Sequence, residues 1–233
     1  MTEKQDLPQI RADRKGRASP ATVLAAVVAA VFGLAAVTFA VLYGMSGSPR
    51  KESSAAVQAC RGAAEAAKRL TPLARGEVAA FTVARSPKPA TELSFLGPDG
   101  QTRKLSDFRG HTVLVNLWAT WCVPCREEMP ALDQLQAKLG GQDFEVVAIN
   151  IDTARLDRRQ QFLNDIGVKS LAFYADPAAD VFQTLKRSGR VVGLPTTMLV
   201  DPEGCDLGVL AGAAEWASED AIRLIEAARK PAS

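Results

Sequence analysis

A pair of cysteines separated by two residues constrains the fold of this chain more than any other feature. Residues 118–125 read WATWCVPC, and the apolar run 113–117 (VLVNL) before them is typical of a buried strand. Two cysteines at this spacing, where a strand passes into a helix, can close a small disulfide ring whose first sulfur faces solvent. Cys122 and Cys125 therefore predict a redox site at the start of a helix.

A helix N-terminus explains the spacing physically. Its unpaired N–H groups and macrodipole stabilise a thiolate at Cys122, and Pro124 fits the first turn because its φ is preset and it has no N–H. We expect Cys122 to attack a partner's disulfide and Cys125 to resolve the mixed disulfide. The competing interpretation, a zinc site, needs two more ligands. The chain offers one histidine, His111, and two cysteines far apart, so no metal site is predicted.

An uncharged, mostly apolar stretch covers residues 21–43 and is long enough to cross a bilayer as one helix. Five basic residues lie in segment 1–20, and Arg50 and Lys51 lie beyond the stretch, so the positive-inside bias favours a cytoplasmic N-terminus. A cleaved signal peptide is the alternative, although its apolar core is usually about 7–15 residues long. We therefore expect an uncleaved anchor with the bulk of the chain exported.

Composition divides the rest of the chain. Residues 46–54 are rich in Ser with Gly and Pro, which predicts a flexible tether. Residues 55–70 are rich in Ala, which predicts a helix that carries Cys60. The expected organisation is a cytoplasmic tail (1–20), a transmembrane anchor (21–43), a tether with a short helix (44–78) and one compact domain (79–233).

Short strands and helices alternate within the predicted domain. The segment 97–100 (GPDG) predicts a hairpin turn. The alternation indicates an α/β fold, with a central mixed sheet covered by helices on both faces. We expect strands at 81–84, 93–96, 101–104, 112–117, 144–151, 171–174, 196–200 and 206–210, and helices at 122–139, 156–166, 177–187 and 218–229.

The distribution of charge argues against one class of partner. The net charge of the chain is +2, which is also the net charge of residues 1–20, so residues 21–233 are neutral overall. Basic residues are dispersed and aromatic residues are few, so nothing in the sequence indicates nucleic-acid binding.

Three segments carry a family resemblance: 105–110 (LSDFRG), 116–130 (NLWATWCVPCREEMP) and 193–197 (GLPTT). With them, the region from Glu92 onward resembles the TlpA-like branch of the thioredoxin superfamily. The resemblance implies a thioredoxin-like fold and a bacterial, membrane-attached reductase. It also implies a catalytic domain that faces the periplasm or the outer surface and takes part in the maturation of cytochrome c or cytochrome oxidase. With the stretch at 21–43, we expect a single-pass anchor in the cell inner membrane and a periplasmic catalytic domain.

One departure from ordinary thioredoxins affects the proton chemistry. The buried acid expected on the central strand is replaced by Asn116, which cannot act as a base. The resemblance points instead to Glu128. Helix geometry agrees, because three residues correspond to about 300° of rotation and bring Glu128 near the face of Cys125, while Glu127 points away. Burial would raise the pKa of Glu128 and make it a proton relay; a solvated glutamate is the alternative.

The resemblance further implies that Pro195 follows a cis peptide bond opposite the disulfide and that Leu194 offers its backbone to an extended client. An ordinary trans proline at a strand edge is the alternative. Trp121 is expected to belong to a docking surface for the client, because amphipathic aromatic side chains suit transient contacts. Val123, Pro124 and Leu194 are expected to belong to the same docking surface.

The remaining cysteines, Cys60 and Cys205, are expected to form a structural disulfide, because extra cysteines in an oxidising compartment are usually paired. The bridge would tie the helix at 55–70 to the C-terminal hairpin. A closed loop of this length stabilises a fold by up to about 5 kcal/mol. Free buried thiols and a second redox relay are the alternatives.

Together these inferences predict a membrane-anchored thiol-disulfide reductase. It would receive electrons from a membrane donor and reduce exported, disulfide-containing clients, either an apocytochrome or a copper-site assembly protein. The sulfur atoms carry the two electrons, so no cofactor is expected. Val123 and Pro124 offer no side-chain donor to the thiolate, which favours a reductase over a disulfide oxidase or isomerase. A non-enzymatic metal-binding assembly factor, the third alternative, would need a suitable distal histidine that the chain lacks.

Overall fold

The computed structural model describes residue 58 and residues 60–154 and 157–230 of the chain. The predicted tail at 1–20 and the predicted anchor at 21–43 lie outside the described residues, and so does most of the expected tether. Within the described part of the chain, the structure contains no helix that is both long enough and apolar enough to cross a bilayer.

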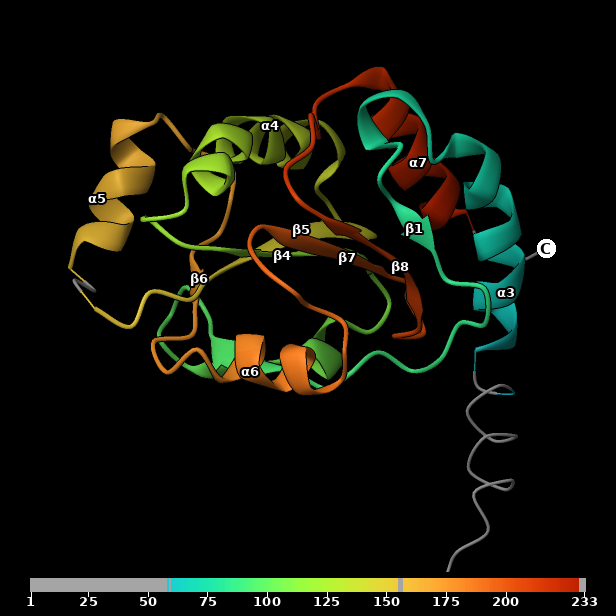
Figure 1. The fold of residues 1–233 in the computed structure, drawn as a ribbon, viewed down its shortest axis with the longest axis horizontal. Coiled ribbons are helices and arrows are strands. Elements are labelled where there is room, and N and C mark those ends of the chain that lie inside the picture. Colours follow the sequence, from blue (N-terminus) through green and yellow to red (C-terminus); the bar gives the residue numbers. More distant parts are fainter. Residues whose placement is uncertain (1–57, 59, 155–156, 231–233) are drawn as a thin grey trace, which may run out of the picture. The chain divides into compact units, whose positions relative to one another are not determined.

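A mixed sheet of eight strands forms the centre of the described domain (Figure 1). Its strand order is β1-β8-β7-β4-β5-β6-β2-β3. β4 runs parallel to β5 and β5 parallel to β6, whereas the other neighbouring strands are antiparallel. The strands are β1 (Thr82–Val83), β2 (Ser94–Leu96), β3 (Thr102–Lys104), β4 (Thr112–Trp118), β5 (Phe144–Asn150), β6 (Tyr174–Ala175), β7 (Thr196–Val200) and β8 (Asp206–Ala211).

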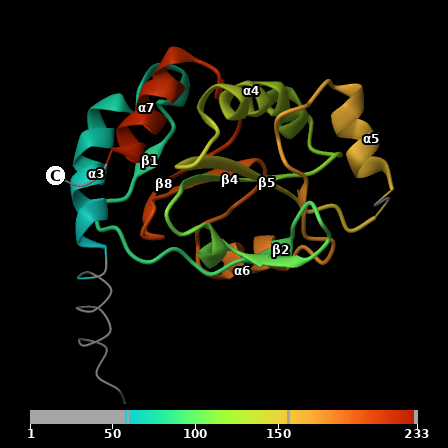
Figure 2. The same cartoon turned by 180° about the vertical axis from the view of Figure 1, so that it is seen from behind.

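Helices cover both faces of this sheet, as the two opposite views in Figures 1 and 2 show. α4 and α7 lie on one face, α6 lies on the other, and α3 lies beside α7 and β8 at the end of the sheet. The α/β class and the central mixed sheet predicted from the sequence are confirmed. The helices are α3 (Arg61–Leu70), α4 (Val123–Leu139), α5 (Arg158–Asp165), α6 (Asp180–Arg187) and α7 (Glu219–Arg229), with 3-10 turns η1 (Thr71–Leu73), η2 (Gly76–Val78) and η3 (Leu105–Phe108).

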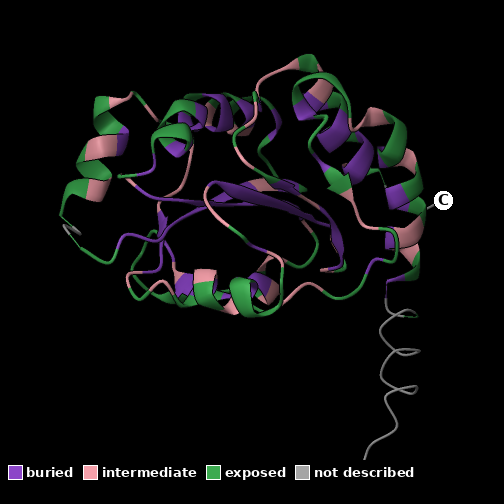
Figure 3. Cartoon of the chain, in the orientation of Figure 1, coloured by how far each residue is buried: buried purple, intermediate pink, exposed green. Residues whose placement is uncertain are grey.

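The middle of the sheet is the most deeply buried part of the molecule (Figure 3). Every residue of β4 and of β7 is buried. A near-continuous apolar run is the pattern of a strand covered on both faces, because neither set of alternating side chains meets water. β4 ends at the redox motif, so a strand that is buried along its whole length leads directly to the start of α4.

The expected boundary at residue 79 is wrong, because residues 60–78 belong to the compact domain. Cys60, Leu70 and Val78 are buried in the same hydrophobic core as the residues of the central strands. α3 packs against α7. Alanine forms most of the buried face of α3. Because alanine is also common on exposed helices, the sequence pattern did not show that this helix is part of the core.

The strand expected at 171–174 is also largely absent, since β6 comprises only Tyr174–Ala175. The carboxylate of Asp133 accepts hydrogen bonds from the backbone N–H groups of residues 169–171 at 3.0, 2.6 and 3.0 Å. These amide groups are directed toward a side chain of α4 and not toward a neighbouring strand. The other expected elements occur with ends shifted by a few residues.

Candidate redox site

The cysteine pair lies where β4 gives way to α4. Cys122 is the N-cap residue of α4, and Cys125 lies in the first turn. A disulfide joins them, with the two Cα atoms 5.3 Å apart. The backbone N–H of Cys125 donates a hydrogen bond to Cys122 Sγ at 3.3 Å. In the reduced protein, the same donor and the helix dipole favour a thiolate at Cys122.

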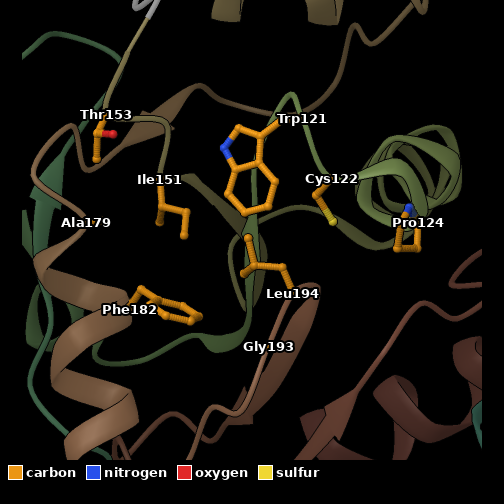
Figure 4. A pocket seen from close by; sticks show the side chains of 9 residues that line it. All are labelled: Trp121, Cys122, Pro124, Ile151, Thr153, Ala179, Phe182, Gly193 and Leu194. Atoms are coloured by element: carbon orange, nitrogen blue, oxygen red, sulfur yellow. The ribbon is translucent and has the colours of Figure 1, made fainter.

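The two cysteines differ in their access to the surface. Cys125 is fully buried, and Cys122 exposes only 6% of its surface, less than the sequence predicts for a sulfur that faces solvent. The accessible side of Cys122 opens into a hollow of about 560 Å³ (Figure 4). An incoming disulfide can therefore meet Cys122 from this hollow. The lining residues are Trp121, Cys122, Pro124, Ile151, Thr153, Ala179, Phe182, Gly193 and Leu194.

The hollow is apolar and is assembled from distant parts of the chain. In Figure 4 the side chains of Trp121, Phe182 and Leu194 converge on it, and none of the described residues that line it is charged. Within the described residues, the exposed large hydrophobic side chains are Trp121, Val123 and Val192, with exposed fractions of 68%, 59% and 85%. Each of the three lines the hollow or directly adjoins a residue that does. Such a concentration of exposed apolar surface marks an interaction site.

The loop before β7 reaches the redox pair because β7 is antiparallel to β4. Leu117 of β4 pairs with Thr196 of β7, so the chain that enters β7 lies beside the end of β4. The Leu194–Pro195 peptide bond in this loop is cis. Leu194 lines the same hollow as Cys122. The structure thus brings together the cysteine pair and the loop residues that the sequence analysis associated with it.

Glu128 is buried one turn of α4 after Cys125 and exposes 3% of its surface. Its Oε1 accepts a hydrogen bond from Asn116 Nδ2 at 2.8 Å. Its Oε2 accepts from the backbone N–H of Ala214 at 3.2 Å and from Trp216 Nε1 at 3.3 Å. Loss of hydration on burial raises the pKa of Glu128 to about 7, although the three hydrogen-bond donors lower it. A carboxyl group with this pKa can take up and return a proton near neutral pH. The neighbouring Glu127 is exposed.

The second disulfide lies outside the hollow. It joins Cys60, the N-cap residue of α3, to Cys205, which directly precedes β8, with the Cα atoms 5.7 Å apart. Both cysteines are buried. Asp201 accepts a hydrogen bond from the backbone N–H of Cys205 at 2.6 Å, and burial raises the pKa of Asp201 to about 6. The bridge therefore fastens α3 to the sheet.

Several residues of the site were not found by sequence reasoning. Thr197 accepts a hydrogen bond from Asn116 at 2.9 Å, although its place in a strand explained it equally well from the sequence. Ala214 and Trp216 donate hydrogen bonds to Glu128, although they lie 86 and 88 positions further along the chain. Phe182 of α6 completes the wall of the hollow. No local pattern marks these residues, because their roles arise from contacts that the folded chain creates.

Comparisons with known proteins agree with this geometry. The sequence profile of the Redoxin family matches residues 84–207. The thioredoxin-like protein YneN of Bacillus subtilis is 32% identical over 118 residues, which cover 49% of this chain and 65% of YneN. The thiol-disulfide oxidoreductase ResA of Geobacillus kaustophilus is 32% identical over 127 residues, which cover 54% of this chain and 68% of ResA. The chain thus spans about two thirds of the length of these curated relatives.

Solved structures share the fold. A candidate thiol:disulfide interchange protein DsbE from Chlorobium tepidum superposes with a TM-score of 0.52 at 34% identity, over 61% of this chain and 96% of that protein. A DsbF homologue from Corynebacterium diphtheriae gives a TM-score of 0.51 at 27% identity, over 63% of this chain and 90% of that protein. The expected thioredoxin-like fold is confirmed. The chain belongs to the Redoxin family, within the branch of the thioredoxin superfamily that includes ResA-type and DsbE-type proteins.

Proposed function

We propose that this protein is a thiol-disulfide oxidoreductase that works as a reductase on exported proteins. The observation that carries the proposal is the asymmetry of the cysteine pair. Cys122 caps α4 and opens into an apolar hollow, whereas Cys125 is fully buried behind it. One sulfur is thus suited to meet a client and the other to finish the exchange. The descriptions of ResA and of the DsbE-type structure support the same chemistry.

The reaction proceeds by two displacements at sulfur. The Cys122 thiolate attacks one sulfur of the client disulfide, and the other client sulfur leaves as a thiolate. The Cys125 thiolate then attacks Cys122 Sγ, the Cys122–Cys125 disulfide forms, and the first client sulfur leaves as a thiolate. Two electrons pass to the client. Glu128 takes the proton that Cys125 must lose before it attacks, and a membrane dithiol donor then reduces the Cys122–Cys125 pair.

The proposed direction follows from the residues between the cysteines. A strong disulfide oxidant depends on a reduced form that is unusually stable, with its thiolate stabilised by nearby donors. Val123 and Pro124 have no side-chain donor, and the hydrogen bond in this turn comes from the backbone N–H of Cys125. The Cys122 thiolate is thus stabilised moderately, as a reductase requires.

The proposed location is the periplasmic face of the cell inner membrane. The apolar stretch at 21–43 and the basic residues before it support a single-pass anchor with a cytoplasmic N-terminus. The second disulfide, between Cys60 and Cys205, suits an oxidising compartment. The proposed clients are an apocytochrome or a copper-site assembly protein. The uncharged lining of the hollow favours a client whose reactive cysteine lies in an uncharged segment.

Mixed-disulfide trapping with the full-length protein tests the chemistry. Cys125→Ser removes the resolving sulfur, so incubation with a disulfide-bonded apocytochrome peptide should accumulate a covalent adduct at Cys122 that a reductant dissolves. Cys122→Ser is the matched control and should form no adduct. Mass spectrometry reads the result. Equal adducts from both variants, or none from either, would contradict the proposed roles.

The reduction potential of the Cys122–Cys125 pair tests the direction separately. Equilibration with a glutathione buffer should give a value near that of thioredoxin, about −270 mV. A value near about −120 mV would instead identify a disulfide oxidase.

A further inference from the structure

Glu128 has three hydrogen-bond partners, and all three are donors: Asn116 Nδ2, the backbone N–H of Ala214 and Trp216 Nε1. A carboxylate only accepts hydrogen bonds, so this arrangement satisfies the ionised form. A protonated carboxyl group adds an O–H that must donate, and none of the three partners can accept from it as they are now oriented. A residue that carries a proton has to adopt both forms. The network therefore needs a second arrangement for the neutral form.

Asn116 contains the acceptor that the neutral form requires. Its side chain is fully buried on β4. Nδ2 donates to Glu128 Oε1 at 2.8 Å and to Thr197 Oγ1 at 2.9 Å, while Oδ1 has no hydrogen-bond partner within the described residues. A half turn about the terminal side-chain bond exchanges the positions of the amide oxygen and nitrogen, and this torsion is soft and roughly two-fold. After the half turn, Oδ1 faces both Glu128 and Thr197.

Thr197 can form a hydrogen bond with Asn116 in both orientations of the amide. Its hydroxyl group can either accept or donate. In the rotated arrangement, the Thr197 hydroxyl and the Glu128 O–H both donate to Asn116 Oδ1, which has two lone pairs. Nδ2 then takes the place of Oδ1 as the atom without a partner. Each orientation makes the same number of hydrogen bonds and leaves one amide atom unpartnered, so the proton on Glu128 decides between them.

Within the described part of the chain, no charged side chain influences the Glu128 carboxyl group: its pKa responds to burial and to its three N–H donors. β4 and β7 present the uncharged Asn116 and Thr197 to Glu128. On α4 the nearest titratable group along the chain that is also buried is Cys125, while Arg126 and Glu127 are exposed. On the segment after β8, Ala214 and Trp216 contribute neutral N–H groups, and Glu215 is exposed.

We propose that Asn116 is a positioning residue whose amide group turns over when Glu128 gains or loses its proton, and that Thr197 completes the hydrogen bonds of both arrangements. The inference rests on the proposed function, in which the Cys125 S–H bond breaks and its proton passes to Glu128. The proton then resides on Oε1, where Asn116 Oδ1 accepts its hydrogen bond. An aspartate at position 116 could not donate to the carboxylate and would add a second negative charge. This gives a role to Asn116, which stands where ordinary thioredoxins have a buried acid.

NMR of the oxidised full-length protein in detergent, with labelled Asn and Glu side chains, tests the turnover of the amide. The carboxyl ¹³C shift of Glu128 reports its charge. At pH values above the Glu128 midpoint, the Asn116 amide protons should show nuclear Overhauser contacts to the side chains of Glu128 and Thr197. Below the midpoint these contacts should be lost, with the same midpoint as the Glu128 carboxyl signal.

Asn150 is an internal control in the same spectra. It is also fully buried, but both ends of its amide are engaged: Nδ2 donates to Asp152 Oδ2 at 2.9 Å, and Oδ1 accepts from the backbone N–H of Asp152 at 3.2 Å. Its contacts should not change with pH. The Glu128→Gln variant should likewise make the Asn116 contacts independent of pH.

Two results would overturn the inference. One is a set of Asn116 contacts that persists unchanged through the Glu128 midpoint. The other is a Glu128 carboxyl signal that reports a single charge state from about pH 5 to about pH 9, a range that brackets neutrality. Because this measurement uses the oxidised protein without a client, its failure is distinct from a failure of the proposed function, which the Cys125→Ser adduct tests.

Discussion

At the scale of single residues, burial gives Glu128 its chemical character. Glu127 and Glu128 are adjacent and chemically identical, yet Glu127 is exposed and Glu128 is buried, with hydrogen bonds from Asn116 and Trp216. Water stabilises an exposed carboxylate, and the buried carboxylate has exchanged that hydration for three N–H donors. The pKa of about 7 that results places its proton exchange in the range where a thiol-disulfide reaction runs.

We predict that Glu128→Gln slows the reduction of a disulfide substrate and removes part of its pH dependence. In the parent protein the rate should rise with pH through about 7, because Glu128 must be ionised to take the proton of Cys125. General bases typically contribute about 10²–10⁴-fold, so we expect a loss of about a hundredfold near neutral pH. Stopped-flow rates from about pH 5 to about pH 9 measure both effects. Glu127→Gln is the matched control, and a parent-like profile in Glu128→Gln would exclude Glu128 from the mechanism.

Glu128 should also make stability depend on pH. Its pKa is raised in the folded state from 4.5 to about 7, so the folded protein binds more protons than the unfolded protein between these values. The free energy of unfolding should therefore fall as pH rises through this window, by about 3 kcal/mol from this group. Below about pH 4.5 the group is neutral in both states and costs nothing.

Urea denaturation of the oxidised parent and of Glu128→Gln at several pH values measures this slope. Asp201, whose pKa burial raises to about 6, contributes in the same direction at lower pH in both proteins. The difference between the two curves therefore isolates Glu128. Parallel curves from pH 4.5 to 7 would show that the buried carboxyl group does not titrate as inferred.

At the scale of elements, the ends of helices carry both disulfides. Cys122 and Cys60 occupy the N-cap positions of α4 and α3, but only the Cys122 side chain accepts a capping hydrogen bond and lines the hollow. Helix α3 is short and depends on packing against α7 and on its link to Cys205 for its place. A helix of this length is marginal without tertiary contacts. A cysteine at a helix start thus takes part in redox chemistry at α4 and in attachment to the sheet at α3.

The double variant Cys60→Ser, Cys205→Ser should be less stable but chemically unaltered. The bridge closes a loop with a sequence separation of 145, and loss of a native disulfide typically costs about 2–5 kcal/mol. Thermal unfolding should show the loss. The reduction potential of Cys122–Cys125 should stay at the parent value, because Cys60 and Cys205 lie outside the hollow. A shifted potential would favour the second redox relay considered from the sequence.

At the scale of the whole molecule, the hollow exists only because topology brings four regions together. The start of α4 supplies Trp121 and Cys122, the segment after β5 supplies Ile151, α6 supplies Phe182, and the loop before β7 supplies Leu194. The parallel strands β4, β5 and β6 place the connections that follow them at one edge of the sheet, where binding sites of such sheets form. A client that reacts with Cys122 must contact this surface.

Truncating the wall of the hollow should weaken client binding without changing the redox chemistry. We expect Phe182→Ala to raise KM about tenfold for a disulfide peptide with an apolar residue beside its cysteine, since a central apolar anchor is typically worth more than 1 kcal/mol. The value of kcat and the reduction potential should change little. Gln183→Ala, an exposed neighbour on α6, is the control. An unchanged KM would place client binding outside the hollow.

Much of the element pattern was predictable from sequence because its causes are local. The WCVPC segment starts a helix through the preset φ of Pro124 and the capping geometry of Cys122, and the GPDG segment turns the chain between β2 and β3. The error at residues 171–174 has a distant cause. Asp133 of α4 accepts hydrogen bonds from the backbone N–H groups of residues 169–171. Strand propensity contains no information about such a partner.

The sequence by itself determined the α/β class, the position of the redox pair at a helix start, and the candidate proton carrier on the same helix. The redox pair and Glu128 lie within a few positions of one another, and the α/β class follows from the alternation of short segments whose patterns are each local. Only the tertiary structure decided that α3 belongs to the core, that Phe182 closes the hollow, and that Asn116, Thr197 and Trp216 surround Glu128. The physical reason is that burial and hydrogen-bond partners are properties of packed neighbours, and strand order brings these neighbours from remote parts of the chain.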